Sequence, residues 1–307
     1  MNKRKILITG VNGFIGKSLF NYVKKEYPKY KVMGIDLHCQ EETDEVLQCD
    51  LFDVDKLKGI LTDIYPDYIS HLSGIRKGGD LDSIRANVLA TKSLLDVIRN
   101  INNPSYNPRI VIIGSAAEYG SIPQFEFIEE SCQTNPVGFY GLVKLMQTRL
   151  SLMYHVNYGM DIIIGRVFNV SGKNTPVDLS LGNFAKQIVE IENATRINNI
   201  ETKGLSSARD FLDIDDICNA FVLLMEKGSS GETYNICSNI SRSIREMLEC
   251  LLSFSKVSNI EIIEEISKDD QILNVVGSNK KITSNLGWQP KVDIKESLLQ
   301  TLESYRV

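Results

Sequence analysis

The chain has 307 residues, of which 43% are apolar and 24% charged, and its formal net charge is −5. This usage is typical of a folded globular protein and excludes the fibrous and disordered classes. The acidic balance contains no basic stripe, and no apolar run approaches the ~20 residues that span a bilayer. We therefore expect neither nucleic acid nor a membrane as a partner.

Residues 1–10 place basic side chains before a short apolar run, as a signal peptide does. The apolar part is too short for that role and leads directly into a glycine motif, so we interpret it as a first strand. The six cysteines lie far apart without the spacing of metal ligands. They predict free thiols, no metal site and a reducing, cytoplasmic location.

Short apolar runs alternate with helical stretches through the first half of the chain. The expected strands are 5–9, 31–36, 68–72, 109–115 and 161–166. The expected helices are 14–26, 54–64, 83–101 and 140–158. Several strands are continuous Ile, Val and Leu runs, as in strands buried on both faces. The alternation predicts an α/β fold with a doubly wound parallel sheet that binds ligands along one edge.

After Asn169 the sequence is richer in Asn and Ser, with isolated apolar stretches. Two later helices are expected at 215–227 and 243–254, the second with Ser241 as its N-cap. We predict one domain over 1–170, with a return segment near 208–237. Residues 171–307 form a smaller, mixed α/β region that packs over the sheet edge and mainly binds substrate.

A glycine motif joins the first expected strand to the first helix. Gly10 permits a tight turn, Gly13 lets the backbone approach a pyrophosphate, and Gly16 lets helix and strand pack closely. The helix start, with Phe14 and Ile15, offers free N–H groups to phosphates. The motif predicts a dinucleotide site; the alternative is a glycine-rich turn without a ligand.

Asp36 ends the second strand, about twenty residues past Gly16. A carboxylate there can accept hydrogen bonds from ribose hydroxyls and would repel a 2′-phosphate, which favours NAD over NADP. The alternative role of Asp36 is a strand-end cap. Asp50, followed by Leu51, either contacts the adenine, as often in this fold, or forms a turn. Leu72, at the end of the fourth strand, is a further predicted cofactor contact.

Tyr140 and Lys144 form a Tyr-x-x-x-Lys pair whose spacing puts both side chains on one helix face. An ammonium and a positive nicotinamide ring stabilise a phenolate, so such a tyrosine can act as general acid or base. Alone, the pair is a weak signal, because any helix can carry it, and the alternative is an exposed pair without a function. Ser115, at the carboxyl end of the fifth strand, can hold a substrate oxygen beside Tyr140, so the three residues together predict a catalytic site.

With these residues the chain resembles, over nearly its whole length, the extended short-chain dehydrogenase/reductase family of nucleotide-sugar epimerases, dehydratases and reductases. Further matching motifs lie at 166–169, 209–213 and 287–290. The resemblance implies a Rossmann fold, NAD as cofactor and a catalytic triad of Ser115, Tyr140 and Lys144. It also implies a homodimer in which the helices from Tyr140 and Ser83 form a four-helix interface.

The same resemblance implies the contacts with a nucleotide-sugar substrate. Asn169 and Arg209 would hold the diphosphate, and an arginine fork suits phosphate oxygens. The alternative for Arg209 is a surface ion pair with Asp210 or Asp213. Lys186 is a further substrate contact, and Lys268 offers a point charge where many relatives have an arginine.

Within the family, segments 114–120, 186–188, 208–213 and 231–238 are most similar to those of GDP-6-deoxy-4-keto-mannose reductases. Ala116 and Ala117 stand where 4,6-dehydratases carry an acid and a glutamate, so elimination of water is not expected. In the loop at 74–79, Arg76 or Lys77 either meets an anionic substrate group or lies in solvent.

We therefore predict hydride transfer at C4 of a nucleotide-linked hexose or heptose, with Tyr140 as acid or base. The enzyme would be a GDP-linked 4-keto sugar reductase or a GDP-sugar 4-dehydrogenase. The alternatives are a 4-epimerase that retains NAD and a non-catalytic NAD-binding regulatory protein. NAD preference fits oxidation somewhat better than reduction, and the sequence leaves the direction open.

Overall fold

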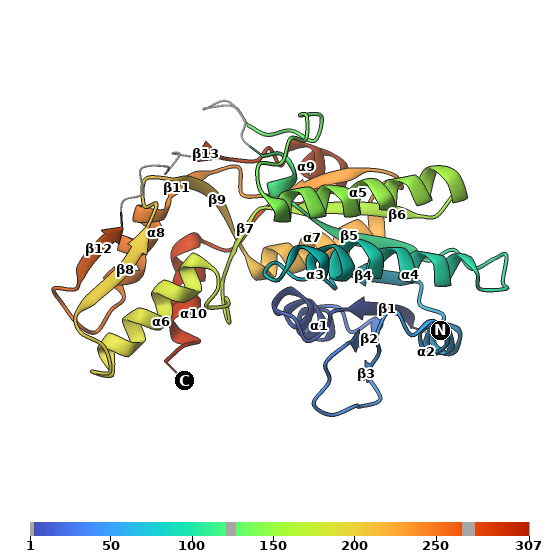
Figure 1. Ribbon diagram of the computed structural model, residues 1–307, viewed down its shortest axis with the longest axis horizontal. Coiled ribbons are helices and arrows are strands. Elements are labelled where there is room, and N and C mark those ends of the chain that lie inside the picture. Colours follow the sequence, from blue (N-terminus) through green and yellow to red (C-terminus); the bar gives the residue numbers. More distant parts are fainter. Residues whose placement is uncertain (1–2, 121–126, 266–273, 307) are drawn as a thin grey trace.

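The computed structural model describes residues 3–120, 127–265 and 274–306. Figure 1 shows a parallel sheet flanked by helices on one side of the molecule and a smaller lobe on the other. The lobe contains α6 (Ser180–Glu192), α8 (Ile244–Ser253), α10 (Ile294–Glu303) and the end of the chain.

Seven parallel strands form the large sheet in the order β10-β6-β5-β4-β1-β2-β3. Their bounds are β1 Arg4–Thr9, β2 Tyr30–Asp36, β3 Val46–Gln48, β4 Tyr68–His71, β5 Arg109–Ser115, β6 Ile162–Val167 and β10 Thr233–Ile236. The chain builds from β1 to β3 on one side and then crosses to β4 on the other side of β1. The carboxyl ends of β1 and β4 are therefore the switch point at which such sheets bind ligands. The predicted doubly wound sheet is confirmed.

Successive residues of the central strands pack on opposite faces of the sheet, in two different hydrophobic clusters. Both faces are buried, which explains why these strands are continuously apolar. Ile6 and Ile8 of β1 pack in one cluster with α1 (Phe14–Glu26) and α7 (Ile214–Lys227). Leu7 packs in a second cluster with α2 (Val54–Ile64), α4 (Ala90–Arg99) and α5 (Phe139–Tyr158). All three β1 side chains are fully buried, so helices cover both faces of the sheet.

The helix predicted over 83–101 is divided into α3 (Asp80–Ile84), a π-helical turn at Arg85–Leu89, and α4. Asn87 in this turn donates through Nδ2 to the carbonyls of Ile75 and Ser83. Every other helix and strand predicted with bounds lies within one residue of its predicted ends. The π-helical turn thus places the Asn87 side chain against Ile75 in the loop that follows β4.

The predicted N-cap of α8 is wrong. Ser243, not Ser241, accepts a hydrogen bond from the Glu246 N–H, and the Glu246 carboxylate accepts the Ser243 N–H in return. Ser241 instead begins the short strand β11 (Ser241–Ser243). The Ser-x-x-Glu pattern of a capping box lies at 243–246, and the prediction overlooked it.

The smaller lobe has its own core between α6, α8 and α10, which includes Phe184, Leu248 and Leu298. Its strands are β7 Asn169–Ser171, β8 Asn199–Lys203, β9 Ala208–Asp213, β11, β12 Glu261–Glu265 and β13 Asn274–Val275. β9 pairs with β7, β11 and β13, and β8 pairs with β12. This confirms the predicted smaller α/β region. All six cysteines are free, and no described helix has the length and apolar character that a membrane crossing needs.

Candidate active site

The glycine motif forms a turn at the switch point that leaves no room for side chains. Gly10 has a φ of 70°, and a Cβ there would lie 2.8 Å from the Ser73 nitrogen. A Cβ on Gly16 would lie 2.0 Å from the Gly10 carbonyl oxygen. α1 begins at Phe14, and because its N-cap is Gly13, no N-cap side chain accepts hydrogen bonds from the first N–H groups of the helix. Its first N–H groups therefore suit the pyrophosphate of a dinucleotide.

Asp36 ties the end of β2 to the glycine motif. Its Oδ2 accepts the Asn12 N–H at 2.9 Å, and its Oδ1 accepts the His38 N–H at 3.0 Å. The strand-end cap that the sequence left as an alternative is thus present. Since a carboxylate has about four acceptor positions, two remain for the hydroxyls of a ribose.

The other predicted cofactor contacts lie near this edge of the sheet. Asp50 forms a turn, because its Oδ1 accepts the Phe52 N–H at 2.9 Å. Leu51 is buried in the core on the α2 side. Leu72 follows β4 directly, and its N–H donates to the Thr9 carbonyl at 3.1 Å. Contacts of these three residues with a cofactor remain predictions.

A buried ion pair fixes the backbone of Ser115. The Ser115 N–H donates to Glu118 Oε1 at 2.8 Å, and the Ser115 hydroxyl oxygen accepts the Ala117 N–H at 3.2 Å. Glu118 is fully buried, and its Oε2 pairs with Arg166 Nε at 2.9 Å. The sequence analysis missed Glu118, although Ser115 and Glu118 have the spacing of a capping box.

Tyr140 lies in the first turn of α5, where its side chain faces Ser115 of β5. Burial raises the pKa of Tyr140, while the neighbouring Ser115 hydroxyl and the positive charge of Arg76 lower it. The negative charge of Glu118 raises it further. The structure therefore brings together the two hydroxyl groups predicted to meet at the substrate oxygen.

Lys144 is only 3% exposed. Its ammonium donates to the Ile113 carbonyl at 2.6 Å and to the Gln147 side-chain carbonyl. Burial lowers the pKa of Lys144 to about 8, against the opposing effect of Glu118. The ammonium has three N–H bonds, and these two contacts leave one for a ligand.

Arg76, in the loop after β4, is exposed and also has a protein partner. Its guanidinium pairs with the Asp178 carboxylate and also donates to the Asp178 carbonyl. Asp178 precedes α6, so this pair connects the large sheet to the smaller lobe beside Tyr140. Lys77, the other candidate in this loop, is exposed.

Asn169 and Arg209 lie on neighbouring strands, β7 and β9. Asn169 Nδ2 donates to the Asp210 carbonyl at 3.1 Å, and burial lowers the pKa of the half-buried Arg209. The carboxylate of Asp210 accepts from Ser238, Asn239 and Gly277. That of Asp213 accepts from Asp215 and Ser297. Both alternative partners of Arg209 thus use their oxygens for other groups.

The two predicted lysine contacts differ. Lys186 lies on the surface of α6 with 51% of its side chain exposed and pairs with Glu190 at 3.5 Å. It is therefore an exposed, adjustable charge. Lys268 lies outside the described residues.

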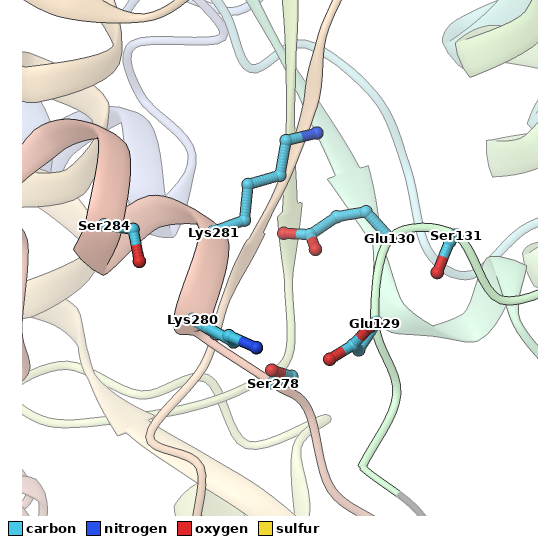
Figure 2. Close-up of a pocket in the computed structure, with 7 residues that line it drawn as sticks. All are labelled: Glu129, Glu130, Ser131, Ser278, Lys280, Lys281 and Ser284. Carbon is cyan, nitrogen blue, oxygen red and sulfur yellow. The ribbon is translucent and has the colours of Figure 1, made fainter.

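A separate pocket of about 370 Å³ lies between residues 129–131 and α9 (Lys280–Leu286). Figure 2 shows Glu129 and Lys280 pointing toward one another across it. Glu130 accepts the Asn235 N–H at 2.7 Å, and Lys281 donates to Glu232 at 2.7 Å. None of the predicted catalytic or cofactor-binding residues is among the described side chains that line this pocket.

The fold and this edge of the sheet define a dinucleotide-binding α/β protein with a serine, a tyrosine and a lysine at one site. The model of the NAD dependent epimerase/dehydratase family matches residues 6–237. The chain belongs to that family. This confirms the resemblance to the extended short-chain dehydrogenase/reductases and the nicotinamide dinucleotide cofactor.

Individual relatives match the chain over nearly its full length. GDP-6-deoxy-D-mannose reductase of Pseudomonas aeruginosa is 25% identical over 98% of this chain and 97% of its own. GDP-6-deoxy-D-talose 4-dehydrogenase of Aggregatibacter actinomycetemcomitans is 27% identical over 91% and 94%. A solved structure, RMD from Pseudomonas aeruginosa complexed with NADPH, covers 99% of both chains at 25% identity with a TM-score of 0.86.

Proposed function

We propose that the protein is an NAD(H)-dependent oxidoreductase that acts at C4 of a nucleotide-activated sugar. It is a GDP-linked 4-keto sugar reductase or a GDP-sugar 4-dehydrogenase. The observation that carries the proposal is the juxtaposition of the Ser115 and Tyr140 side chains, with the buried Lys144 one helical turn further along α5. The names of the two GDP-sugar relatives support the substrate class.

The cofactor that fits this edge is NAD. Gly10 and Gly13 would hold its pyrophosphate at the start of α1, beside Phe14 and Ile15, and Gly16 would let the helix pack closely against the turn. The remaining acceptor positions of Asp36 take the ribose hydroxyls, and its charge disfavours a 2′-phosphate. When bound, the nicotinamide ring donates or accepts the hydride.

Tyr140 moves the proton that accompanies the hydride. In reduction, its hydroxyl donates a proton to the C4 carbonyl oxygen; in oxidation, its phenolate takes the proton of the C4 hydroxyl. Ser115 orients that oxygen by a hydrogen bond. Lys144 holds the nicotinamide ribose with its remaining N–H, and its charge favours the phenolate. Ala116 and Ala117 have no proton to transfer, so water is not eliminated.

The nucleoside diphosphate binds across β7 and β9. Asn169 donates its remaining amide N–H, and the Arg209 guanidinium binds phosphate oxygens in two-pronged fashion. Lys186 and Lys268 add positive charge from the smaller lobe. The Lys186–Glu190 pair is exposed and therefore opens at little energetic cost.

We also propose that two copies pair through α5 and the α3–α4 segment, as the family resemblance implies. α5 exposes apolar side chains at Leu142, Met146, Met153 and Val156, whereas Leu145 and Leu150 are half-buried. A second copy would cover this exposed face. Light scattering should give twice the mass of one chain at micromolar concentration. The free thiols suit the cytoplasm, which we propose as its location.

The test is to incubate the purified protein with GDP- and UDP-sugars that carry a hydroxyl or a keto group at C4, while nicotinamide absorbance is followed. Net oxidation or reduction of the cofactor is expected with a GDP-sugar. A sugar product without net cofactor turnover would identify a 4-epimerase instead. Binding of NAD without any reaction across the panel would identify a non-catalytic protein.

A further inference from the structure

A chain of buried polar side chains leads from Lys144 to the glycine motif. Lys144 donates to Gln147 Oε1, and Gln147 Nε2 donates to Thr91 Oγ1 at 2.8 Å. Thr91 Oγ1 lies 2.8 Å from His71 Nε2, and His71 Nδ1 lies 2.7 Å from Thr9 Oγ1. None of the five side chains is more than 3% exposed.

The hydrogen-bond directions in this chain follow from the number of protons. The Thr91 hydroxyl donates its one proton to the Asn87 carbonyl at 2.6 Å, so it must accept from both Gln147 and His71. His71 therefore carries its proton on Nε2 and accepts the Thr9 hydroxyl at Nδ1. Burial and the positive charge of Lys144 lower the pKa of His71 to about 3, which keeps the ring neutral. The direction of each of the four hydrogen bonds that link the five side chains is thereby fixed.

We propose that Gln147 is a positioning residue for Lys144, held in place by Thr91 and His71, which connect it to Thr9 beside Gly10. The inference rests on the proposed role of Lys144 in the reaction. With Ile113 and Gln147 each accepting one N–H, the ammonium has a fixed orientation in which the third N–H serves the ligand. The same chain links β1 to β4 at the point where the sheet binds its ligand.

A neutral amide at 147 is chemically suited to this task. An apolar side chain would leave an N–H of a buried ammonium without an acceptor, which is costly. A carboxylate would satisfy the N–H but neutralise the charge that favours the Tyr140 phenolate. Glutamine orients the ammonium of Lys144 without neutralising its charge. The Gln147 amide nitrogen also donates a hydrogen bond to Thr91 Oγ1.

The other charged groups near Lys144 are the same in the wild type and in Gln147 variants, so a shift in the pKa of Lys144 can be assigned to residue 147. Glu118 of the turn after β5 raises the pKa of Lys144 and is itself paired with Arg166 of β6. His71 of β4 is neutral, and Arg76 acts on Tyr140 of α5. These groups remain unchanged in variants of Gln147.

The test is the pH dependence of kcat in two variants that should shift the pKa of Lys144 in opposite directions. Gln147→Met removes the acceptor, so Lys144 should lose its proton at lower pH. The alkaline limb of the kcat profile, where activity falls as the pH rises, should then move down by about one pH unit. Gln147→Glu preserves the shape and adds a negative charge, so the limb should move up by about one pH unit. The KM for the nucleotide sugar should change little in both.

Ser151→Ala is the matched control, since Ser151 is buried one turn along α5 and its hydroxyl donates only to the Gln147 backbone carbonyl at 2.7 Å. It should leave the limb in place. The proposal would be overturned if the alkaline limb of the kcat profile stays at the wild-type pH in both Gln147 variants, or if it moves in the same direction in both. The pH dependence of NAD affinity gives the same readout if the Met variant is too unstable for kinetics. Full activity of Lys144→Met would instead refute the proposed role of Lys144 itself.

Discussion

The proposed site residues are held in different ways in the large-sheet region and in the smaller lobe. In the former, Glu118, Lys144 and the chain from Gln147 to Thr9 are buried and bonded to one another. In the latter, Arg209 is half-buried and Lys186 has 51% of its side chain exposed. Burial fixes side-chain geometry before a ligand arrives, whereas exposed charges adjust to it. If the proposed roles are correct, the proton-transfer residues are rigid and the substrate contacts are adaptable.

The largest expected effect is on the buried site. Tyr140→Phe removes the general acid–base and should lower kcat by ~10²-fold to ~10⁴-fold. NAD affinity should remain close to that of the wild type, because the glycine motif is untouched. Steady-state kinetics and NAD titration check both expectations. A variant with the wild-type rate would show that another group moves the proton.

The free energy of unfolding should respond differently to loss of the buried Glu118–Arg166 pair and of the exposed Lys186–Glu190 pair. Glu118→Gln leaves Arg166 buried without its counter-charge and should lower the free energy of unfolding by about 3–5 kcal/mol. Lys186→Ala breaks an exposed pair on α6 and should lower it by less than about 0.5 kcal/mol. Urea unfolding of both variants measures the two values. Similar losses in both would remove the contrast between the regions.

Arg209→Lys should separate substrate binding from cofactor binding. The charge is kept, but an ammonium cannot reproduce the two-pronged contact, so affinity for a nucleoside diphosphate should fall by about 10-fold to 100-fold. NAD affinity should not change. Titration of GDP and NAD into both proteins measures this, with a thermal melt as control. Equal weakening of both ligands would indicate that Arg209 supports the fold.

The smallest expected effect is on the choice of cofactor. Asp36→Ala removes ribose acceptors and a charge that repels a 2′-phosphate, so NAD affinity should fall by about tenfold relative to NADP affinity. The loss of the bond to Asn12 affects both cofactors equally, so the ratio isolates the ribose contact. An unchanged ratio would mean that Asp36 serves only as a cap.

The sequence predicted the sheet region well because burial on both faces leaves a local signal. Ile110 to Ile113 is a continuous apolar run, and the glycine motif stands directly between a strand and a helix. The lobe lacks such signals, since β8 pairs with β12 about sixty residues later, and only two of the five β8 residues are buried. Long-range pairing of this kind depends on tertiary contacts rather than local pattern.

In the candidate site, too, some residues could be predicted from local sequence patterns and others could not. The spacing of Tyr140 and Lys144 is visible within one helix, and Ser115 stands at the end of a strand. Gln147, Thr91 and His71 are unremarkable polar residues in three separate segments, and only the fold brings them into hydrogen-bond distance. Glu118 could have been found from its capping-box spacing, and so could the Lys186–Glu190 pair from its i, i+4 spacing.

The central claim, hydride transfer at C4 beside Tyr140, is tested most directly by following the hydride itself. NADH carrying deuterium at the transferable position of the nicotinamide is incubated with the enzyme and a GDP-linked 4-keto-6-deoxy sugar. The product is then analysed by NMR. The account predicts one deuterium at C4 of the sugar and stoichiometric formation of NAD. Deuterium at another carbon, or a sugar product that contains none, would contradict it.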